Sequence, residues 1–334
     1  MNGQPHTSSR ELFRGVDTPD EAAAAQVREA LAASVRGRSF GRLGEIAAWV
    51  AACQSETVPA PFERPRAIVV AGNHGVATRG LSAYAPEASA AQVEEIRSGG
   101  GPGNSVARAA NSSLRLIDAF VTAPCGAIDI EDAMSAEEFD RALTLGVEVA
   151  DQEVDAGTDL IIPGDVGVGN TTVAAVVFGV LTRTEPVVAV GRGSGISDDV
   201  WKVKVAAVRD AMFRCRDFAD DTERVLRVAS SPDFVFLVAL IAQAAVRRTP
   251  VLIDSAYGAV AAFVAEKLAP GTKRWLAAGQ LSPEPCHTVC VQALGLTPVL
   301  ALDMSTGQAA GSLLALPVIN TAAELVGEEL GGRE

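Results

Sequence analysis

Hydrophobic and polar positions follow two patterns along this chain, and the first pattern is helical. Ile46, Trp49 and Val50 stand at positions i, i+3 and i+4, and residues 22–35 are rich in strong helix formers. Residues 18–21 (Thr-Pro-Asp-Glu) form a capping box with proline at the first helical position. A proline-rich stretch follows, so we expect residues 1–60 to form a small helical unit and a linker.

The second pattern, from residue 61 onward, alternates short apolar runs with longer helix-like stretches. Such alternation predicts parallel strands joined by crossover helices. The runs that we assign to strands are residues 67–71, 114–121, 159–162, 186–190, 250–253, 275–278 and 298–302. The expected fold class is therefore α/β, with a Rossmann-like parallel sheet flanked by helices. We place the large parallel domain at 61–311 and a small helical domain at 1–60 plus 312–334.

Unusual polar residues follow these predicted strands, where parallel sheets bind their ligands. They are Asn73, His74, Asp165, the glycine-rich residues 191–195, Asp254, Gln280 and Asp303. An imidazole at this edge can bind a ligand, act as acid or base, or make a structural hydrogen bond. The edge is therefore the candidate site.

The most informative segment is residues 164–172 (Gly-Asp-Val-Gly-Val-Gly-Asn-Thr-Thr), between a predicted strand and a predicted helix. Glycines let backbone N–H groups approach an anion, and a helix N-terminus favours phosphate. The segment is not a Walker A loop, because no lysine follows the glycines, and Thr172 replaces the third glycine of GxGxxG. A tight structural turn has a similar composition, so both interpretations stay open.

Other segments permit a binding role and a structural role. Residues 191–195 (Gly-Arg-Gly-Ser-Gly) are a second phosphate or ribose cradle or a simple turn. Lys204 is a point charge for phosphate or a solvated side chain. Residues 99–104 suit close approach to a ligand or to another segment. For Glu284, held between two prolines, a buried structural carboxylate is the default interpretation.

Composition narrows the partners to small molecules. The chain is 48% hydrophobic and carries a formal net charge of −13, with no basic stripe, which disfavours nucleic acid and anionic membranes. The start lacks a signal-peptide pattern and no run of eighteen uncharged apolar residues follows, so we expect a cytoplasmic protein. Its five scattered cysteines indicate reduced thiols, and Cys286, His287 and Cys290 lack a second ligand pair, so we expect no metal.

From about residue 15 onward the chain resembles the nicotinate-nucleotide:dimethylbenzimidazole phosphoribosyltransferase family. Ala71-Gly72-Asn73-His74-Gly75-Val76 is similar to the family's AGNHGV, and Ser82-Ala83-Tyr84-Ala85-Pro86 to its SAYP. Six further segments are similar to family motifs: 39–43 to SLGRL, 99–104 to GGAAIN, 164–172 to GEMGIGNTT, 191–195 to GRGTG, 250–254 to PVIIDG and 279–287 to GHxSxExGH. Lys204 stands where the family has a helix lysine.

The resemblance implies transfer of 5-phosphoribosyl from nicotinate mononucleotide to an aromatic base, with no cofactor and as a homodimer. It implies that the nucleotide is bound by Asp165, Gly167, Gly169, Asn170, Thr171, Thr172 and Lys204. Ser82, Tyr84 and Ala91 would border the acceptor, and Gln308, Asp165 and Asp303 are the candidates for catalysis. Further candidate substrate-binding residues are Asn73, His74, Arg192, Gly193, Ser194, Gly195, Ser282 and Glu284.

The chain departs from the family on the acceptor side. The family's catalytic glutamate lies in a GMRLGEGTGA motif, and the matching position here is Gln308, whose amide cannot take a proton. Asp165 replaces a glutamate, Ala91 a glutamine, Gln280 a histidine, and residues 230–231 a Gly-Gly pair. Three interpretations follow: an active transferase with a different acceptor, a dimethylbenzimidazole enzyme that tolerates Gln308, or a non-catalytic nucleotide-binding or partner subunit, of the kind that pairs with a paralogue as a heterodimer.

Overall fold

The computed structural model describes Phe13 and residues 15–332, and its centre is a five-stranded parallel sheet of order β2-β1-β3-β4-β5. The strands are β1 (Pro65–His74), β2 (Ser113–Cys125), β3 (Leu160–Val166), β4 (Val251–Ile253) and β5 (Leu276–Ala278). A separate parallel pair joins β6 (Gln280–Leu281) to β7 (Leu300–Ala301). The predicted fold class, a parallel α/β sheet flanked by helices, is confirmed.

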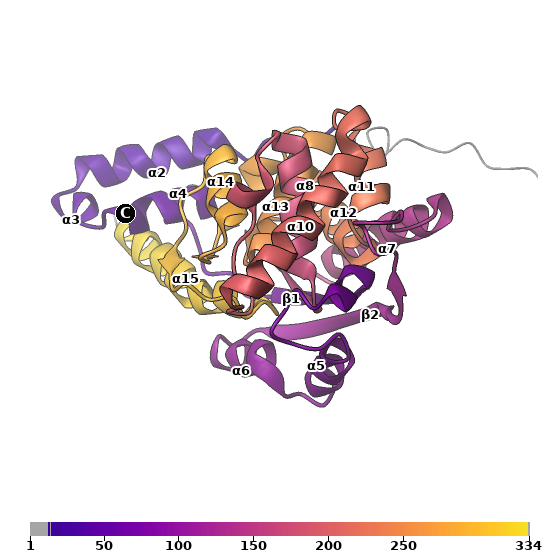
Figure 1. Cartoon of the computed structure of the whole chain (residues 1–334). Coiled ribbons are helices and arrows are strands. Elements are labelled where there is room, and N and C mark those ends of the chain that lie inside the picture. Colours follow the sequence, from indigo (N-terminus) through magenta and orange to yellow (C-terminus); the bar gives the residue numbers. More distant parts are fainter. Residues whose placement is uncertain (1–12, 14, 333–334) are drawn as a thin grey trace, which may run out of the picture.

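Helices cover both faces of the sheet (Figure 1). The strand residues alternate between the two layers of helices. One layer contains α7 (Ala136–Asp155), α8 (Asn170–Thr182), α12 (Pro232–Val246) and α13 (Ala256–Leu268). The other contains α5 (Ala88–Arg97), α6 (Gly101–Ala109) and the first half of α15 (Ala310–Gly331). Ile161 packs into the first layer, whereas Leu160 and Ile162 pack into the second. This period of two places apolar residues on both faces of the sheet.

The strand order has a switch point between β1 and β3. The chain leaves β1 for β2 at one edge, and then returns to the other side of β1 with β3, β4 and β5. Crossovers on opposite sides of this point leave a crevice at the carboxyl ends of the two strands. His74 ends β1 there, and Val166 ends β3. The predicted ligand edge therefore contains the switch point.

A helical unit is formed by both ends of the described chain. It contains α2 (Glu21–Ala33), α3 (Val35–Arg38) and α4 (Arg42–Gln54), packed against the second half of α15 through Ala322 and Val326. The expected capping box is wrong in register: Asp20 is the N-cap, and its carboxylate accepts from the N–H groups of Ala22 and Ala23. The exact domain boundaries stay a prediction.

Helix α15 connects this unit to the sheet. By length and apolar composition it is long enough to cross a membrane, yet over half of its apolar window is buried in the protein. Leu313, Leu316 and Ile319 pack beneath the sheet with Leu160 and Leu252. Burial on this scale is typical of a core helix.

Two predicted strands of the main sheet are wrong. Residues 186–190 contain a short helix, α9 (Pro186–Ala189), on which Val187 and Val188 are exposed. A short apolar run cannot be assigned by periodicity, and proline suits the first turn of a helix. Of residues 298–302 only Leu300 and Ala301 form a strand, and they pair with β6 instead of the main sheet.

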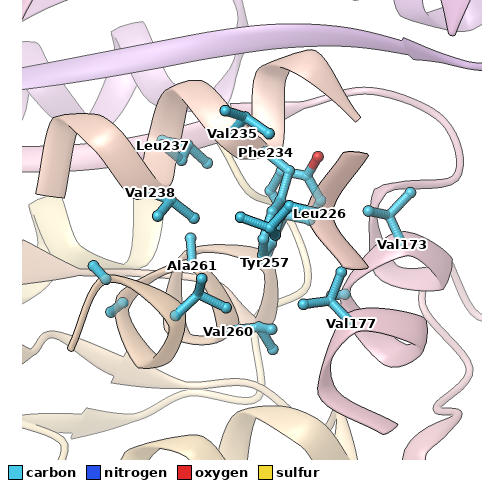
Figure 2. Packing of buried hydrophobic residues seen from close by; sticks show 14 of the residues in the cluster. Val173, Val177, Leu226, Phe234, Val235, Leu237, Val238, Tyr257, Val260 and Ala261 are labelled. Carbon is cyan, nitrogen blue, oxygen red and sulfur yellow. The ribbon is translucent and has the colours of Figure 1, made fainter. Parts of the chain in front are cut away.

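The remaining elements complete the layers. They are η1 (Gly75–Arg79), α10 (Asp198–Cys215), η2 (Arg216–Phe218), α11 (Thr222–Ala229), η3 (Thr272–Trp275) and α14 (Pro285–Ala293). The largest core cluster includes α8, α11, α12 and α13 (Figure 2). In it Tyr257 is fully buried against Phe234, with ring centroids 5.0 Å apart in an edge-to-face arrangement. This core packs against the sheet that contains the switch point.

Candidate active site

A cavity of about 580 Å³ opens at the switch point, within the usual range of small-molecule sites, roughly 300–1,000 Å³. Its wall brings together most of the residues that the sequence singled out. These are Ser82, Tyr84, Asp165, Gly167, Gly169, Asn170, Thr171, Thr172, Gly193, Ser194, Lys204, Ser282, Glu284 and Gln308. They come from segments far apart in sequence, so the fold assembles one site.

The glycine-rich loop turns directly from β3 into α8. Gly169 is the N-cap of α8 at φ +99°, a left-handed conformation that favours glycine. The N–H groups of Thr172 and Val173 donate to the Gly169 carbonyl at 2.9 and 3.2 Å. The Thr172 hydroxyl is buried without a hydrogen-bond partner among the described residues. The loop therefore offers a helix N-terminus and one unsatisfied hydroxyl at the cavity.

Lys204 is the buried cation of the site. It enters from α10, and its Nζ donates to Thr171 Oγ1 at 2.8 Å and to the Gly191 carbonyl at 3.2 Å. Burial lowers the pKa of Lys204, and the charge of Glu284 opposes that effect. Two donor hydrogens are thus used to fix the ammonium, which leaves the third for an anion.

Glu284 lies beside Lys204 and holds the second glycine-rich segment. Its Oε1 accepts from the Gly193 N–H at 2.7 Å, and its Oε2 is buried without a partner in the described part of the chain. A side chain at Gly191 would overlap this carboxylate, because a Cβ there would lie 2.4 Å from its oxygens. The predicted structural role of Glu284 is present, and Oε2 remains as a free acceptor at a cavity-lining residue.

Asp165 is a buried carboxylate at the end of β3. Its oxygens accept hydrogen bonds from Ser255 Oγ and Asn170 Nδ2. Burial raises its pKa despite those hydrogen bonds, and the neighbouring Asp233 adds to the effect. Asp254, after β4, is likewise buried, and burial together with the charge of Asp165 raises its pKa to about 7. Burial therefore shifts both carboxyl groups toward the protonated form, at Asp165 in the cavity lining and at Asp254 outside that lining.

Gln308 lies in a tight turn that crosses the carboxyl ends of the strands. Gly307, Gln308 and Ala309 all have φ between 59° and 68°, and the Gln308 N–H donates to the Asp165 carbonyl at 2.9 Å. Its Oε1 accepts from the Gly103 N–H in the first turn of α6 at 3.1 Å. This contact explains the glycine-rich residues 99–104, since a Cβ at Gly103 would lie 2.7 Å from the Gln308 carbonyl oxygen. The amide Nε2 is the donor that Gln308 retains for the cavity.

The opposite wall comes from α5 and the segment before it. Ser194 Oγ accepts from the Ala83 N–H at 2.9 Å and lies 3.1 Å from Ser82 Oγ, so the two glycine- and serine-containing loops are joined. Tyr84 is exposed at the cavity mouth. Gln92 and Glu95, one turn apart on α5, also line the wall.

His74 supports the loop from beneath rather than lining the cavity. Its Nδ1 lies 2.9 Å from the Val168 carbonyl and its Nε2 lies 3.2 Å from both oxygens of Asp233. Burial by itself lowers the pKa of His74, but the Asp233 carboxylate outweighs it and the net shift is upward. The pKa of Asp233 is lowered, because the charge and hydrogen bond of His74 and the Tyr257 hydroxyl outweigh burial. Both directions indicate a buried ion pair.

Several predicted residues lie away from the cavity wall. Asp303 is exposed, Ala91 is exposed on α5, and Arg192 pairs with Asp198. Asn73 Nδ2 donates to the Val121 carbonyl, and Gly195 only turns the chain at φ +82°. The structure places none of these side chains in the lining.

The sequence interpretation missed other lining residues, namely Gln92, Glu95, Ser255, Tyr257 and residues 304–307. Ser255 could have been found, because it follows Asp254 directly at a strand end. Gln92 and Glu95 gave no signal in the sequence beyond a helical spacing. Within the described ranges no group of three or more His, Cys, Asp or Glu could hold a metal ion. His287 instead accepts the Ser282 N–H at Nδ1, and burial lowers its pKa to about 4.

A parallel sheet with a glycine-rich loop and a buried lysine at its switch point is typical of α/β-class enzymes that bind phosphorylated ligands. A family model described as phosphoribosyltransferase (DBI_PRT) matches residues 16–330. The chain belongs to this family, as the resemblance of its motifs predicted.

Proteins named for the same activity match this chain over nearly their whole length. The nicotinate-nucleotide:dimethylbenzimidazole phosphoribosyltransferases of Corynebacterium efficiens and Mycobacterium avium are 48% and 46% identical, over 95% and 93% of this chain and 89% and 93% of theirs. CobT from Thermus thermophilus superposes with a TM-score of 0.86 at 31% identity, over 91% of this chain and 96% of that one. These comparisons favour a transferase over the non-catalytic subunit.

Proposed function

We propose that this phosphoribosyltransferase takes nicotinate mononucleotide as donor and dimethylbenzimidazole or a related N-heteroaromatic base as acceptor. One observation carries the proposal: the phosphate-type loop, Lys204 and Gln308 line a single cavity. An anion site and an acceptor-side group in one cavity are what a two-substrate transfer of a phosphorylated sugar needs.

In this proposal the 5-phosphate occupies the N-terminus of α8. Lys204 supplies the counter-charge, and the unpartnered Thr172 hydroxyl is a further hydrogen-bond donor. Glu284 Oε2, unpartnered in the described residues, accepts from a sugar hydroxyl. These contacts fix C1′ between the nicotinate ring and the acceptor.

The transfer itself needs little covalent chemistry from the protein. The C1′–N bond of the pyridinium breaks, and its electron pair returns to the ring nitrogen, so nicotinate leaves with an uncharged ring and its carboxylate intact. The lone pair of the acceptor nitrogen forms the new bond to C1′, and the second ring nitrogen then loses its proton. The transition state resembles an oxocarbenium ion, and Glu284 Oε2, the unpartnered acceptor at the cavity, is the group placed to stabilise its positive charge.

The experiment is a reaction of the purified chain with nicotinate mononucleotide and dimethylbenzimidazole. Mass spectrometry should detect nicotinate and the ribotide of the base in equal amounts. Lys204→Met should lose donor affinity, whereas Lys202→Met, on the exposed face of the same helix beside Asp199, should not. Absence of donor binding by a folded wild type would overturn the proposal.

Two further properties rest on the resemblance alone. We propose a homodimer in the cytoplasm, with pairing to a paralogue as the alternative partner. Light scattering of the purified chain tests the first, because a monomer at micromolar concentration would contradict it.

A further inference from the structure

We propose that Glu95 of α5 accepts the acceptor's proton in place of the carboxylate that Gln308 cannot supply. The inference rests on the proposed function and names a catalytic residue for it. It starts from an observation about the cavity: Glu95 is a carboxylate on its wall, and it is exposed there.

Glu95 and Gln308 flank the same point. A Cβ on Gly101 would lie 3.1 Å from Gln308 Oε1 and 3.6 Å from Glu95 Oε2. Both groups can therefore contact one aromatic ring bound beside the first turn of α6. A carboxylate in this place can take a proton where a glutamine amide cannot.

The position of Glu95 is held by the same helix that holds Gln308. The Glu95 carbonyl accepts from the Gly100 N–H at 2.9 Å and from Ser98 Oγ at 2.8 Å. Asn104 Nδ2 donates to the Ile96 and Gly100 carbonyls at 2.9 and 2.8 Å, which ties the turn to α6. Gly103 in α6 then binds Gln308. The turn thus sets the distance between the two side chains.

The carboxylate is free to act. Among the described residues it has no hydrogen-bond or ion-pair partner, whereas the adjacent Glu94 pairs with Arg97 at 2.6 Å. Of the other cavity carboxylates, Asp165 accepts two side-chain hydrogen bonds, and Glu284 binds the Gly193 N–H through Oε1 and keeps its buried Oε2 for a sugar hydroxyl in the proposed donor complex. Because Glu95 is exposed, the proton taken from the second ring nitrogen can pass on to solvent.

The test compares kcat for Glu95→Gln, Glu94→Gln, Gln308→Glu and the Glu95→Gln/Gln308→Glu double variant, with nicotinate mononucleotide and dimethylbenzimidazole. Loss of a general base typically costs ~10²–10⁴-fold, so Glu95→Gln should lose kcat on that scale while binding the donor as the wild type does. Glu94→Gln should match the wild type. The double variant should regain activity, because a carboxylate returns on the facing wall.

The pH profile separates catalysis from a structural role. The acidic limb of kcat should vanish in Glu95→Gln and return in the double variant. Two results would overturn this inference and leave the proposed transferase activity intact. The first is a kcat of Glu95→Gln equal to that of the wild type, and the second is a loss of kcat in Glu95→Gln that Gln308→Glu does not rescue in the double variant. A wild type that binds the donor but transfers nothing to any N-heteroaromatic base would instead overturn the proposed function.

Discussion

The side chain of Gln308 and the backbone of Gly103, 205 residues apart in sequence, meet through a 3.1 Å hydrogen bond. The contact joins the turn before α15 to the first turn of α6 and closes one side of the cavity. A glutamate at position 308 could accept the same N–H. The departure from the family's glutamate therefore changes the proton chemistry of the site while its hydrogen bond to α6 is kept.

Gly103→Ala should disrupt this contact. The new methyl would lie 2.7 Å from the Gln308 carbonyl oxygen, so the turn must shift, with an expected loss of about 1–3 kcal/mol in unfolding free energy. kcat should fall, because the Gln308 side chain moves. Thermal denaturation and steady-state kinetics check both, with Gly331→Ala as control because nothing lies within 4 Å of a Cβ there. Wild-type values for Gly103→Ala would contradict the contact.

Lys204→Met should weaken donor binding. A hydrogen bond from a charged group contributes roughly 1.5–3 kcal/mol, so KM for the donor should rise about tenfold to hundredfold. Because burial lowers the pKa of Lys204, the wild type should begin to lose donor affinity at a lower pH than an ordinary lysine would allow. Lys204→Arg should remove that pH dependence, since arginine stays charged. Calorimetric titrations across pH measure it.

Asp233→Asn should strip the buried His74 imidazolium of its counter-charge. Breaking a buried ion pair from one side typically costs about 3–5 kcal/mol. KM for the donor should rise as well, since His74 holds the Val168 carbonyl in the loop. Asp220→Asn, in an exposed pair with Arg183, should change stability by less than about 0.5 kcal/mol. Urea denaturation of both variants checks the contrast.

The His74–Asp233 pair also predicts a loss of stability at high pH. The folded pKa of His74 is raised above 6.5, so its contribution is fully present below pH 6.5 and is lost as pH rises through the folded value. The wild type should lose this contribution as pH rises above 6.5 and through the folded pKa of His74, and Asp233→Asn should not. Equal slopes of unfolding free energy against pH in both proteins would count against the ion pair.

Asp254→Asn should change how the free energy of unfolding depends on pH between about pH 4 and pH 7. Because burial raises the pKa of Asp254 from 3.8 to about 7, its contribution is fully present below 3.8 and is lost as pH rises through 7. The amide of the variant stays neutral at every pH. Its free energy of unfolding should therefore rise relative to that of the wild type by on the order of 4 kcal/mol across this interval. Denaturant titrations at successive pH values check it. A constant difference would mean that Asp254 is already ionised at pH 4.

The sequence by itself determined the fold class, the glycine turn between β3 and α8, and the family. Consecutive apolar residues such as Leu160, Ile161 and Ile162 specify a strand buried on both faces, and local glycines specify a turn such as that at Gly169. These signals are local, so they can be read without the fold. The same locality explains the error at residues 186–190, where four or five apolar residues fit a strand and a helix equally well.

Only the tertiary structure decided which polar residues share the cavity. His74 ends β1 and Asp303 follows β7, where ligand contacts were predicted, yet His74 supports the loop from beneath and Asp303 is exposed. Glu95 carries no motif, and it reaches Gln308 only because the α5–α6 turn packs against the turn before α15. Contacts between segments two hundred residues apart depend on the packing of whole elements, and a local pattern of residue types does not encode them.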